Sequence, residues 1–525
     1  MLFNSYSFIF AFLPLTLLGF FWLARYEHKL AAAWLAAASL FFYGWWNIAY
    51  VGLLLGSIAF NYTLGVWIAR GRVRRQAISK GHLLTFAVAA NLSMLAYYKY
   101  ANFFLETLND MVGTGLDLGT IILPLGISFF TFTQIAFLVD TYRGGVKEYN
   151  FLHYSLFVTY FPHLIAGPIL HHKEIMPQFS KTSTYRLDPL GFSVGLSIFA
   201  IGLFKKTVLA DGVAPHADTI FAAAAQGGHP GLLQAWGGVL AYSVQLYFDF
   251  SGYSDMAIGL SRMFGIVLPL NFYSPYQALN IIDFWRRWHM TLSRFLRDYL
   301  YIPLGGSRSG RPRRYLNLGI TMVLGGLWHG AGWTYVAWGA LHGVFLLVNH
   351  VWQELRKALG QELARSAWTG RLASRFVTLL GVTVAWVFFR ATNFQSATQI
   401  LKGICGLNGL FLPIAVVDLL GPLKPLFQRL GGHIEMGGGG EFVSTYAWIL
   451  ALWSIVLFAP NTSQIMRHFT PGLDYPPKGI TEAFRSVDRI PAWNLSLFWA
   501  VITGLLAACG LLSLAHVSPF LYFQF

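Results

Sequence analysis

The sequence is poor in charge, in cysteine and in alternating polar patterns. Charged residues make up 11% of its 525 residues and hydrophobic residues 55%. Because soluble domains contain about 25% charged residues, this composition excludes a soluble globular protein and indicates a multi-pass membrane protein. The two cysteines, Cys405 and Cys509, lie in apolar or glycine-rich stretches, which excludes a disulfide framework or a cysteine-based zinc site. The apolar runs are continuous, which favours helices over the alternating strands of a barrel.

Acidic residues are scarcer than basic ones, 22 against 37, and the formal net charge is +15. Such an excess can indicate nucleic-acid binding, but here the lysines and arginines lie in short loops between apolar runs. That distribution is typical of cytoplasmic loops. We therefore expect no nucleic-acid partner, contact with membrane lipid, and a location in a bacterial inner membrane. Residues 1–29 lack the basic region and cleavage site of a signal peptide, so we expect an uncleaved first helix with its N-terminus outside.

The apolar runs predict an all-α protein with eleven or twelve membrane-spanning helices in one domain, residues 1–525. Candidate spans lie at residues 5–24, 30–48, 51–69, 83–101, 121–139, 188–204, 232–248, 315–328, 333–351, 373–391, 443–460 and 493–515. A separate, shorter apolar piece is expected at 256–270 and a long outer loop at 392–442. Residues 151–187 are interrupted by Pro162 and Gly167, so we expect them to re-enter the membrane and line a cavity.

One stretch, residues 283–298, concentrates charge around aromatic residues. Its six charged residues are Asp283, Arg286, Arg287, Arg294, Arg297 and Asp298. Each charge at a bilayer centre costs roughly 2.5–3.5 kcal/mol, so the six together would cost about 15–20 kcal/mol. The stretch therefore cannot face lipid, and we expect a helix on the membrane surface or inside the protein. A turn-rich basic loop, 305–314, separates it from an apolar run that ends in GGLWHG at 325–330.

His329 lies at the end of that run among glycines. Gly325, Gly326 and Gly330 allow neighbouring backbones to approach closely, which places the imidazole in a packed interior beside Trp328. A neutral imidazole there can accept the proton of an attacking hydroxyl, and such general base catalysis contributes roughly 10²–10⁴-fold to a rate. A purely structural histidine is the equal alternative at this point.

His289 lies within the charged stretch, with Arg286 at i−3 and Ser293 at i+4 on one helix face. A histidine satisfied by those neighbours is the alternative to a catalytic one. Arg286 and Arg287 are candidates for binding the phosphates of a CoA-type donor, because guanidinium groups suit phosphate; contacts with lipid headgroups are the alternative. If His289 and His329 serve one site, their rings lie close together in a shared cavity open to the cytoplasm.

For the other polar residues in the apolar runs we expect structural roles. Asp249 and Asp255 are expected to pair with Arg286 or Arg287, although carboxylates inside a membrane are functional candidates by default. Three further histidines stand near prolines, at His163, His171 and His172. No carboxylate or cysteine cluster completes a metal site with them, so we expect no metal and no bound cofactor. The sequence also contains no GxSxG elbow, P-loop or Rossmann fingerprint.

Several motifs together resemble the membrane-bound O-acyltransferase family, in particular its bacterial polysaccharide O-acetylase branch. They are PHLIAGP at 162–168, YFDFSGYSD at 247–255, WRRWH at 285–289, RDYLYIPLGG at 297–306, GGLWHG at 325–330 and SPFLYFQF at 518–525. The resemblance extends from the first helix to the last residue. The core motifs fall within residues 121–345. The C-terminal helices and a tail similar to an acyl carrier lie within residues 443–525.

The resemblance implies that helices surround a central cavity and that the protein transfers acetyl groups from a cytoplasmic donor, acetyl-CoA, to an exported polysaccharide. Alginate is the first polymer expected, with peptidoglycan or cellulose next. His329 matches the family's catalytic histidine, and His289 matches a second polar position with a positioning or electrostatic role. A periplasmic partner similar to SGNH hydrolases is implied as well. The alternative from another class is a transporter of polysaccharide or lipid-linked sugar, but internal repeats typical of transporters are not visible.

The C-terminal motif implies a role for Tyr522. In the signature that the tail resembles, the tyrosine carries the acyl group from the membrane enzyme to the exported partner. A phenol with a pKa near 10 is a better leaving group than a sugar hydroxyl, so an acetyl-tyrosine can pass its acyl group onward. The alternative is an aromatic anchor at the membrane interface, which explains the phenylalanines but not the hydroxyl.

Overall fold

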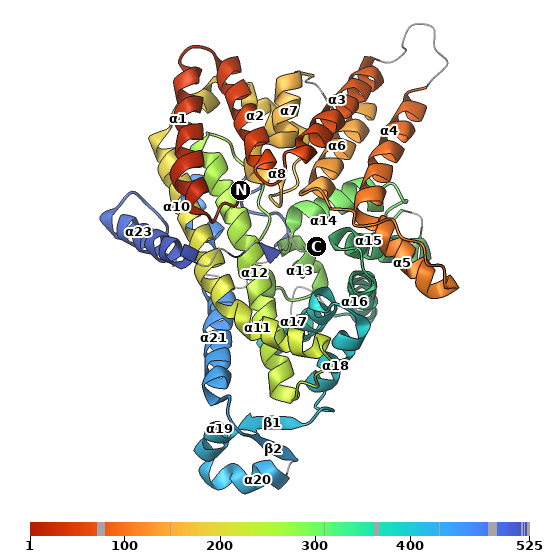
Figure 1. Ribbon diagram of the computed structural model, residues 1–525, viewed down its shortest axis with the longest axis vertical. Coiled ribbons are helices and arrows are strands. Elements are labelled where there is room, and N and C mark those ends of the chain that lie inside the picture. The colour runs from red at the N-terminus through yellow and green to blue at the C-terminus, as the bar shows by residue number, and fades with distance from the viewer. Residues whose placement is uncertain are drawn as a thin grey trace.

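The computed structural model describes residues 1–70, 79–146, 149–308, 310–361, 367–429, 431–480, 491–515, 518 and 520–521. Over these residues nearly all regular structure is helical, which confirms the expected all-α fold (Figure 1). The exception is a parallel pair of short strands, β1 (Leu410–Pro413) and β2 (Gly432–Glu435). Short π and 3₁₀ segments, marked η, interrupt or extend several of the α-helices.

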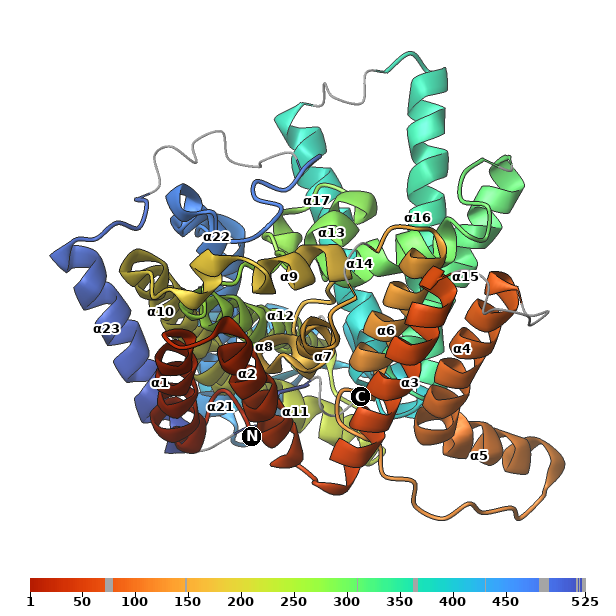
Figure 2. The same cartoon turned by 90° about the horizontal axis from the view of Figure 1, so that it is seen from above.

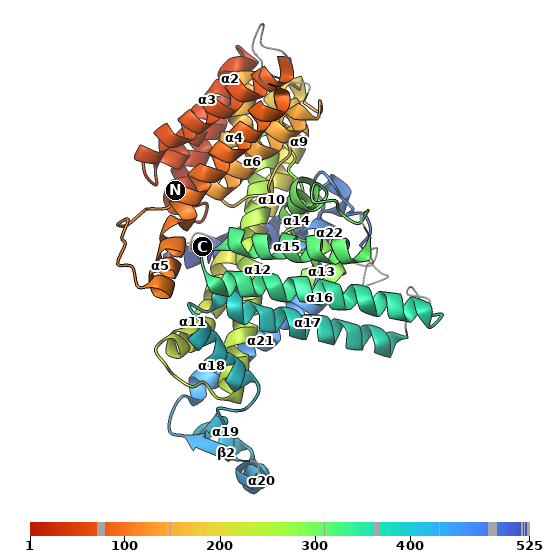
Figure 3. The ribbon, with the colours of Figure 1, turned by 90° about the vertical axis from the view of Figure 1, so that its right-hand side faces the viewer.

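Most of the N-terminal helices form a bundle at one end of the molecule, and the helix that begins at Ala101 lies apart from it (Figure 3). In chain order they are η1 (Phe8–Phe12), α1 (Leu13–Ala24), α2 (His28–Gly44), α3 (Ala49–Arg70), α4 (Lys80–Leu95), η2 (Ala96–Tyr100), α5 (Ala101–Val112) and α6 (Ile127–Tyr142). Within the bundle α6 packs against both α3 and α4, and α1 packs against α2. The run expected as a single span at 83–101 is therefore longer in the structure, because η2 joins α4 directly to α5.

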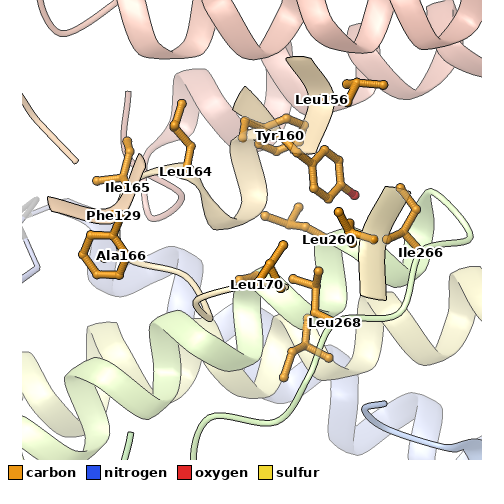
Figure 4. Close-up of a cluster of buried hydrophobic side chains, with 14 of the residues drawn as sticks. Phe129, Leu156, Tyr160, Leu164, Ile165, Ala166, Leu170, Leu260, Ile266 and Leu268 are labelled. Carbon is orange, nitrogen blue, oxygen red and sulfur yellow. The ribbon is translucent and has the colours of Figure 1, made fainter. Parts of the chain in front are cut away.

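The expected break in 151–187 is confirmed. The elements there are α7 (Phe151–Thr159), α8 (Phe161–Leu164), α9 (His172–Phe179) and η3 (Thr182–Tyr185). Between α8 and α9 the backbone is not helical although it is buried, and its apolar side chains pack in the cluster of Figure 4. Side chains satisfy two backbone amides here: at the start of α8 Phe161 N donates to Ser39 Oγ at 3.2 Å, and within the non-helical segment Ile169 N donates to Thr291 Oγ1 at 3.0 Å. That the segment lines a cavity stays a prediction.

The middle of the chain contributes the central helices. They are α10 (Pro189–Phe204), η4 (Lys205–Ala210), α11 (Asp211–Ala225), α12 (Leu232–Met263), η5 (Pro275–Gln277), α13 (Ile281–Arg287), α14 (Met290–Leu296), η6 (Arg297–Tyr301), α15 (Arg311–His329), α16 (Trp333–Ala358), α17 (Trp368–Arg390) and α18 (Phe394–Ile404). In Figure 3 α15, α16 and α17 run side by side across the molecule. Short helices α13 and α14 lie near its centre in Figures 1, 2 and 3.

The expected separation of a span at 232–248 from a shorter piece at 256–270 is wrong, because α12 is one helix of 32 residues. Its polar middle does not face lipid but packs against α10. A Cβ at Gly252 would lie 2.8 Å from the carbonyl oxygen of Gly202, and one at Gly259 would lie 2.5 Å from that of Gly195. These glycines let the two backbones approach closely, so the helix continues through the FSGYS sequence.

The expected pairing of Asp249 and Asp255 with arginines of the charged stretch is also wrong. Asp255 Oδ2 lies 2.8 Å from Nζ of Lys205, and Asp249 Oδ1 lies 2.6 Å from Nζ of Lys206. Both lysines come from η4, which follows α10 directly. The close approach of α10 and α12 brings η4 beside the polar middle of α12, and buried charges are stable only when paired.

The C-terminal part contains the small two-stranded element and the last helices. They are α19 (Ile414–Leu419), η7 (Gly421–Leu423), α20 (Lys424–Arg429), α21 (Gly439–Phe458), α22 (Thr462–Ile465), η8 (Arg467–Phe469), α23 (Leu497–Leu512) and η10 (Ser513–Ala515). The region expected as an outer loop, 392–442, thus contains regular structure. In Figure 1 the strands, α19 and α20 lie together at one end of the molecule, beyond α21.

Among the described residues, four helices are long and apolar enough to cross a membrane by length and composition. They are Ala49–Arg70, Pro189–Ala225, Trp368–Arg390 and Gly439–Phe458. Two shorter apolar helices are Phe8–Ala24 and Leu497–Leu512. This confirms a protein with several membrane-spanning helices, whereas the count of eleven or twelve stays a prediction.

Helices α15 and α16 pack so closely that a side chain cannot fit between them at two positions. A Cβ at Gly326 would lie 2.3 Å from the carbonyl oxygen of Tyr335, and one at Gly339 would lie 2.3 Å from that of Met322. At Gly330 a Cβ would lie 2.2 Å from the ring of Tyr335. The predicted close approach around the GGLWHG motif is thereby confirmed.

We predict that Gly326→Ala separates α15 from α16 and destabilises the protein. Overpacking of this kind costs about 1–3 kcal/mol, and the new methyl group would meet backbone atoms. The matched control is Gly319→Ala on the same helix, where a Cβ has no neighbour within 4 Å. Thermal unfolding in detergent, followed by tryptophan fluorescence, should show a lower melting temperature for the first variant only. Equal melting temperatures for both variants would contradict the close contact.

Candidate active site

The structure brings together the two histidines that the sequence singled out. The ring centroids of His289 and His329 lie 6.2 Å apart, and both side chains are buried. His289 comes from the junction of α13 and α14, and His329 is the last residue of α15. The predicted proximity of the two rings is confirmed, while their chemical roles stay predictions.

His329 is held in place because the end of its helix is capped from η2. The last carbonyl groups of a helix lack helical partners and must find others when they are buried. Here Nζ of Lys99 donates to the carbonyl oxygens of Trp328 at 2.5 Å and His329 at 3.3 Å. The hydroxyl of Tyr100 donates to the carbonyl oxygen of Leu327 at 2.9 Å. Sequence reasoning missed Lys99 because no local pattern connects it to α15.

Aromatic residues surround the imidazole of His329. Its ring centroid lies 5.1 Å from those of Trp328 and Trp338 and 5.2 Å from that of Phe389. A cavity of about 10 Å³ remains beside it, and its lining residues are Leu246, Phe250, Trp288, His329, Trp338, Trp386 and Phe389. Such a volume holds about one water molecule. His289 does not line this cavity, so a shared cavity open to the cytoplasm stays a prediction.

The expected continuous helix over 283–298 is wrong, because the chain breaks at His289. Its φ and ψ of 43° and 53° are left-handed, a conformation that is uncommon for residues other than glycine. His289 therefore does not share a helix face with Arg286 and Ser293. Instead its Nδ1 lies 3.1 Å from Oδ1 of Asn271, a residue that sequence reasoning missed. Of the two placements expected for the stretch, on the membrane surface or inside the protein, the buried side chains of Asp283, Arg287 and His289 favour the second.

Burial keeps the His289 imidazole neutral. The side chain is fully buried, and its desolvation lowers the pKa to about 3. Helices α13 and α14 have seven residues each, too few to cross a membrane. A neutral imidazole has one nitrogen with a lone pair, so His289 can accept a proton or a hydrogen bond at neutral pH.

Comparisons with known proteins agree on the family. The model of the membrane-bound O-acyltransferase family matches residues 140–391. A peptidoglycan O-acetyltransferase of Helicobacter pylori is 46% identical over 440 residues, 78% of this chain and 81% of the relative. A probable alginate O-acetylase AlgI of Azotobacter vinelandii is 38% identical over 540 residues, with 100% of both chains covered. This chain belongs to the membrane-bound O-acyltransferase family.

Membership of the family identifies the protein as an O-acyltransferase and excludes the transporter alternative. A more distant relative, a teichoic acid D-alanyltransferase of Streptococcus thermophilus, is 29% identical over 286 residues, 50% of this chain and 68% of the relative. Both histidines fall within the part that the family model matches. The acyl groups and acceptors named for these relatives differ, so the family alone does not identify the substrates.

The two arginines that are candidates for donor binding lie in different surroundings in this acyltransferase. Arg287 is buried, and its Nε lies 2.9 Å from Oδ1 of Asp283 in an ion pair one helical turn apart. Arg286 is exposed and donates from Nη1 to the carbonyl oxygen of Gly479 at 3.2 Å. Only Arg286 therefore presents its guanidinium at the surface, and a donor contact by either stays a prediction.

A second polar cluster contains two of the histidines considered for metal binding. The hydroxyl of Tyr299 donates to Oδ2 of Asp140 at 2.9 Å and lies 3.1 Å from Nδ1 of His171. Nδ1 of His172 lies 3.3 Å from the same carboxylate. Burial, aided by the positive charge of Arg294, lowers the pKa of His171 to about 4. Among the described residues no group of three or more potential ligands is arranged to hold a metal ion.

The described part of the C-terminal tail enters the core of the acyltransferase. The backbone N of Leu521 donates to Oδ2 of Asp249 at 3.1 Å. The ring of Phe520 lies 4.3 Å from that of Tyr253, and Phe520 is only 1% exposed. An anchor in the membrane interface would leave Phe520 exposed to lipid, so that alternative is wrong for this residue. Tyr522 lies outside the described residues.

We predict that His329→Ala lowers acyl transfer by about 10²-fold or more, because it removes the proposed general base. His289→Ala should lower it strongly without abolishing it. The acetate content of exported polysaccharide, compared at equal protein levels in the membrane, provides the measurement. His229→Ala is the control, since His229 is exposed and contacts Gln399. Acetylation of the His329 variant above a few per cent of wild type would make that histidine structural.

Proposed function

We propose that this acyltransferase takes an acetyl group from acetyl-CoA at the cytoplasmic face of a bacterial inner membrane and delivers it to an exported polysaccharide. The observation that carries the proposal is the pair of buried imidazoles, 6.2 Å apart, within the part that matches the family. Such a pair offers both a proton acceptor and a second polar group beside one reaction centre.

The chemistry assigned to this centre is acyl transfer to a hydroxyl. The hydroxyl oxygen attacks the thioester carbonyl carbon of the donor, and a C–O bond forms as the C–S bond breaks. His329 accepts the hydroxyl proton and returns it to the departing thiolate. His289 stands beside it as the second polar group, with a positioning or electrostatic role. The aromatic walls exclude bulk water, which would otherwise hydrolyse the thioester.

Alginate is the polymer that we propose first. The probable alginate O-acetylase AlgI of Azotobacter vinelandii aligns with 100% of this chain at 38% identity, which supports this choice. Peptidoglycan is the second candidate because the Helicobacter pylori peptidoglycan O-acetyltransferase has the higher identity, 46%, although over 78% of the chain. The acetate content of each polymer in a deletion strain distinguishes the two.

A relay through the tail is the route that we propose for the acetyl group. Leu521 packs in the same hydrophobic cluster as Phe250, Trp288, Trp338 and Phe389, which surround the histidines. Tyr522 is the next residue in the sequence and lies outside the described residues. In this relay its hydroxyl is the first acceptor of the acetyl group. A periplasmic partner similar to SGNH hydrolases would then take the acetyl group from the tyrosine and pass it to the polymer.

Incubation of the purified protein with acetyl-CoA labelled in the acetyl group tests the donor. We expect label on the protein or on an added partner, and no label after His329→Ala. The control reaction contains CoA labelled in the adenine moiety, which should leave nothing on the protein because only the acetyl group is transferred. Absence of label with wild-type protein in both the presence and absence of partner would reject acetyl-CoA as the donor.

We predict that Tyr522→Phe blocks polymer acetylation while the protein still inserts in the membrane. The substitution keeps the ring and removes only the hydroxyl oxygen that would carry the acetyl group. The acetate content of the polymer is measured at matched protein levels. Phe525→Leu is the control within the same tail, since it removes no hydroxyl and should leave acetylation unchanged. Normal acetylation in Tyr522→Phe would show that the tail does not carry the acyl group.

A further inference from the structure

The side-chain oxygen of Asn271 contacts three polar atoms in the interior of the protein. Its Oδ1 lies 3.3 Å from the backbone N of Thr291, 2.9 Å from the hydroxyl of Thr291 and 3.1 Å from Nδ1 of His289. Asn271 and Thr291 are 1% and 2% exposed, so water does not compete for these contacts. The segment that contains Asn271 joins α12 to α13 and carries no motif that sequence reasoning singled out.

The backbone amide of Thr291 determines which end of the Asn271 side chain faces it. A backbone N–H is always a donor, so the amide atom within its reach must be the oxygen and not the nitrogen. The same oxygen faces Nδ1 of His289. An amide oxygen cannot donate, so Nδ1 must carry the proton in that contact. In a neutral imidazole the lone pair is then on Nε2.

We propose that Asn271 is a positioning residue that fixes the tautomer of His289, so that Nδ1 is protonated and Nε2 is the nitrogen able to accept a proton or hydrogen bond. In water a neutral histidine side chain favours the opposite tautomer, so the protein must supply the preference. Asn271 does so from outside the reaction centre, in the way that a third residue orients the base of a catalytic triad.

The backbone around Asn271 also stabilises the left-handed conformation of His289. The backbone N of Met290 donates to the carbonyl oxygen of Asn271 at 2.9 Å, and that of Tyr273 donates to the carbonyl oxygen of Arg287 at 3.0 Å. These two bonds attach the chain on both sides of His289 to one segment. A left-handed conformation costs of order 1–3 kcal/mol away from glycine and persists when its surroundings enforce it. The imidazole orientation and the backbone break thus have a common source.

The network reaches the non-helical segment between α8 and α9. The hydroxyl of Thr291 accepts a hydrogen bond from the backbone N of Ile169 at 3.0 Å and donates its own proton to Asn271. The position of His289 is therefore linked through two side chains to Ile169, the residue that follows the PHLIAGP motif. Thr291 contributes two donors to Asn271, but its backbone N–H alone is enough to orient the amide oxygen. A substitution that removes only the Thr291 hydroxyl is therefore a matched control.

Solid-state NMR of protein labelled with ¹³C and ¹⁵N in histidine and reconstituted in lipid reads the tautomer directly. A His289→Gln sample assigns the His289 signals by their loss. We expect wild-type His289 to be protonated on Nδ1, and Asn271→Leu, which has a similar size but no acceptor, to show the Nε2-protonated form. Thr291→Val should keep the wild-type tautomer because its backbone N–H still orients Asn271. Asn271→Asp should keep the Nδ1 proton because a carboxylate oxygen replaces the amide oxygen.

Wild-type protein with the proton on Nε2 would overturn the proposal, and this result needs no variant. An unchanged tautomer in folded Asn271→Leu would overturn it as well. So would a loss of the Nδ1-protonated form in Thr291→Val equal to that in Asn271→Leu, because the effect would then come from general packing. Transfer of labelled acetyl from acetyl-CoA supplies the functional measurement, which rests on the proposed function. There Asn271→Leu should lower kcat by about 10²-fold without changing KM. Absence of transfer in wild type rejects the donor while the NMR result still decides the tautomer.

Discussion

The end of α15 is the constraint on which the rest of the site depends. A helix that stops inside a membrane protein leaves carbonyl groups that water cannot reach, and each unsatisfied one costs about 1–3 kcal/mol. Lys99 and Tyr100 remove that cost by donating to the last three carbonyls, those of residues 327–329. Because both donors come from η2, the N-terminal bundle and the α15–α16 pair cannot shift independently. The position of His329 follows from a contact with a segment far away in the sequence.

Local pattern predicted His329 better than it predicted His289. The glycines around His329 indicate close backbone contact whatever the rest of the fold, and the structure has that contact at Gly326 and Gly330. The break at His289 has no such local sign, since neither glycine nor proline stands in the WRRWHM sequence. It depends on hydrogen bonds from the segment of Asn271, which only the folded chain brings alongside. Periodicity alone therefore favoured a continuous helix.

The errors over α12 have one physical origin. Apolar runs interrupted by polar residues look like separate spans when lipid is assumed on every side. In the structure the polar middle of α12 faces α10 and η4, where Asp249 and Asp255 find Lys206 and Lys205. Proximity in sequence to the arginines of the charged stretch suggested other partners. Which cations meet these carboxylates is decided by the glycine contacts between α10 and α12, and sequence spacing does not reveal such a register.

The charges buried at Lys206 also explain why the tail enters the core. The ammonium group lies 2.6 Å from Asp249 and 2.7 Å from Asp211, so these two carboxylates contact the same cation. Buried carboxylates are stable in the interior only if further donors also reach them. The backbone N–H of Leu521 is one of these donors, at 3.1 Å from Asp249. Asp249 precedes Phe250, whose ring lies 4.8 Å from that of His289. The ion cluster therefore holds the described part of the tail beside the candidate active site, and this arrangement supports the proposed relay by a contact that does not involve the tyrosine.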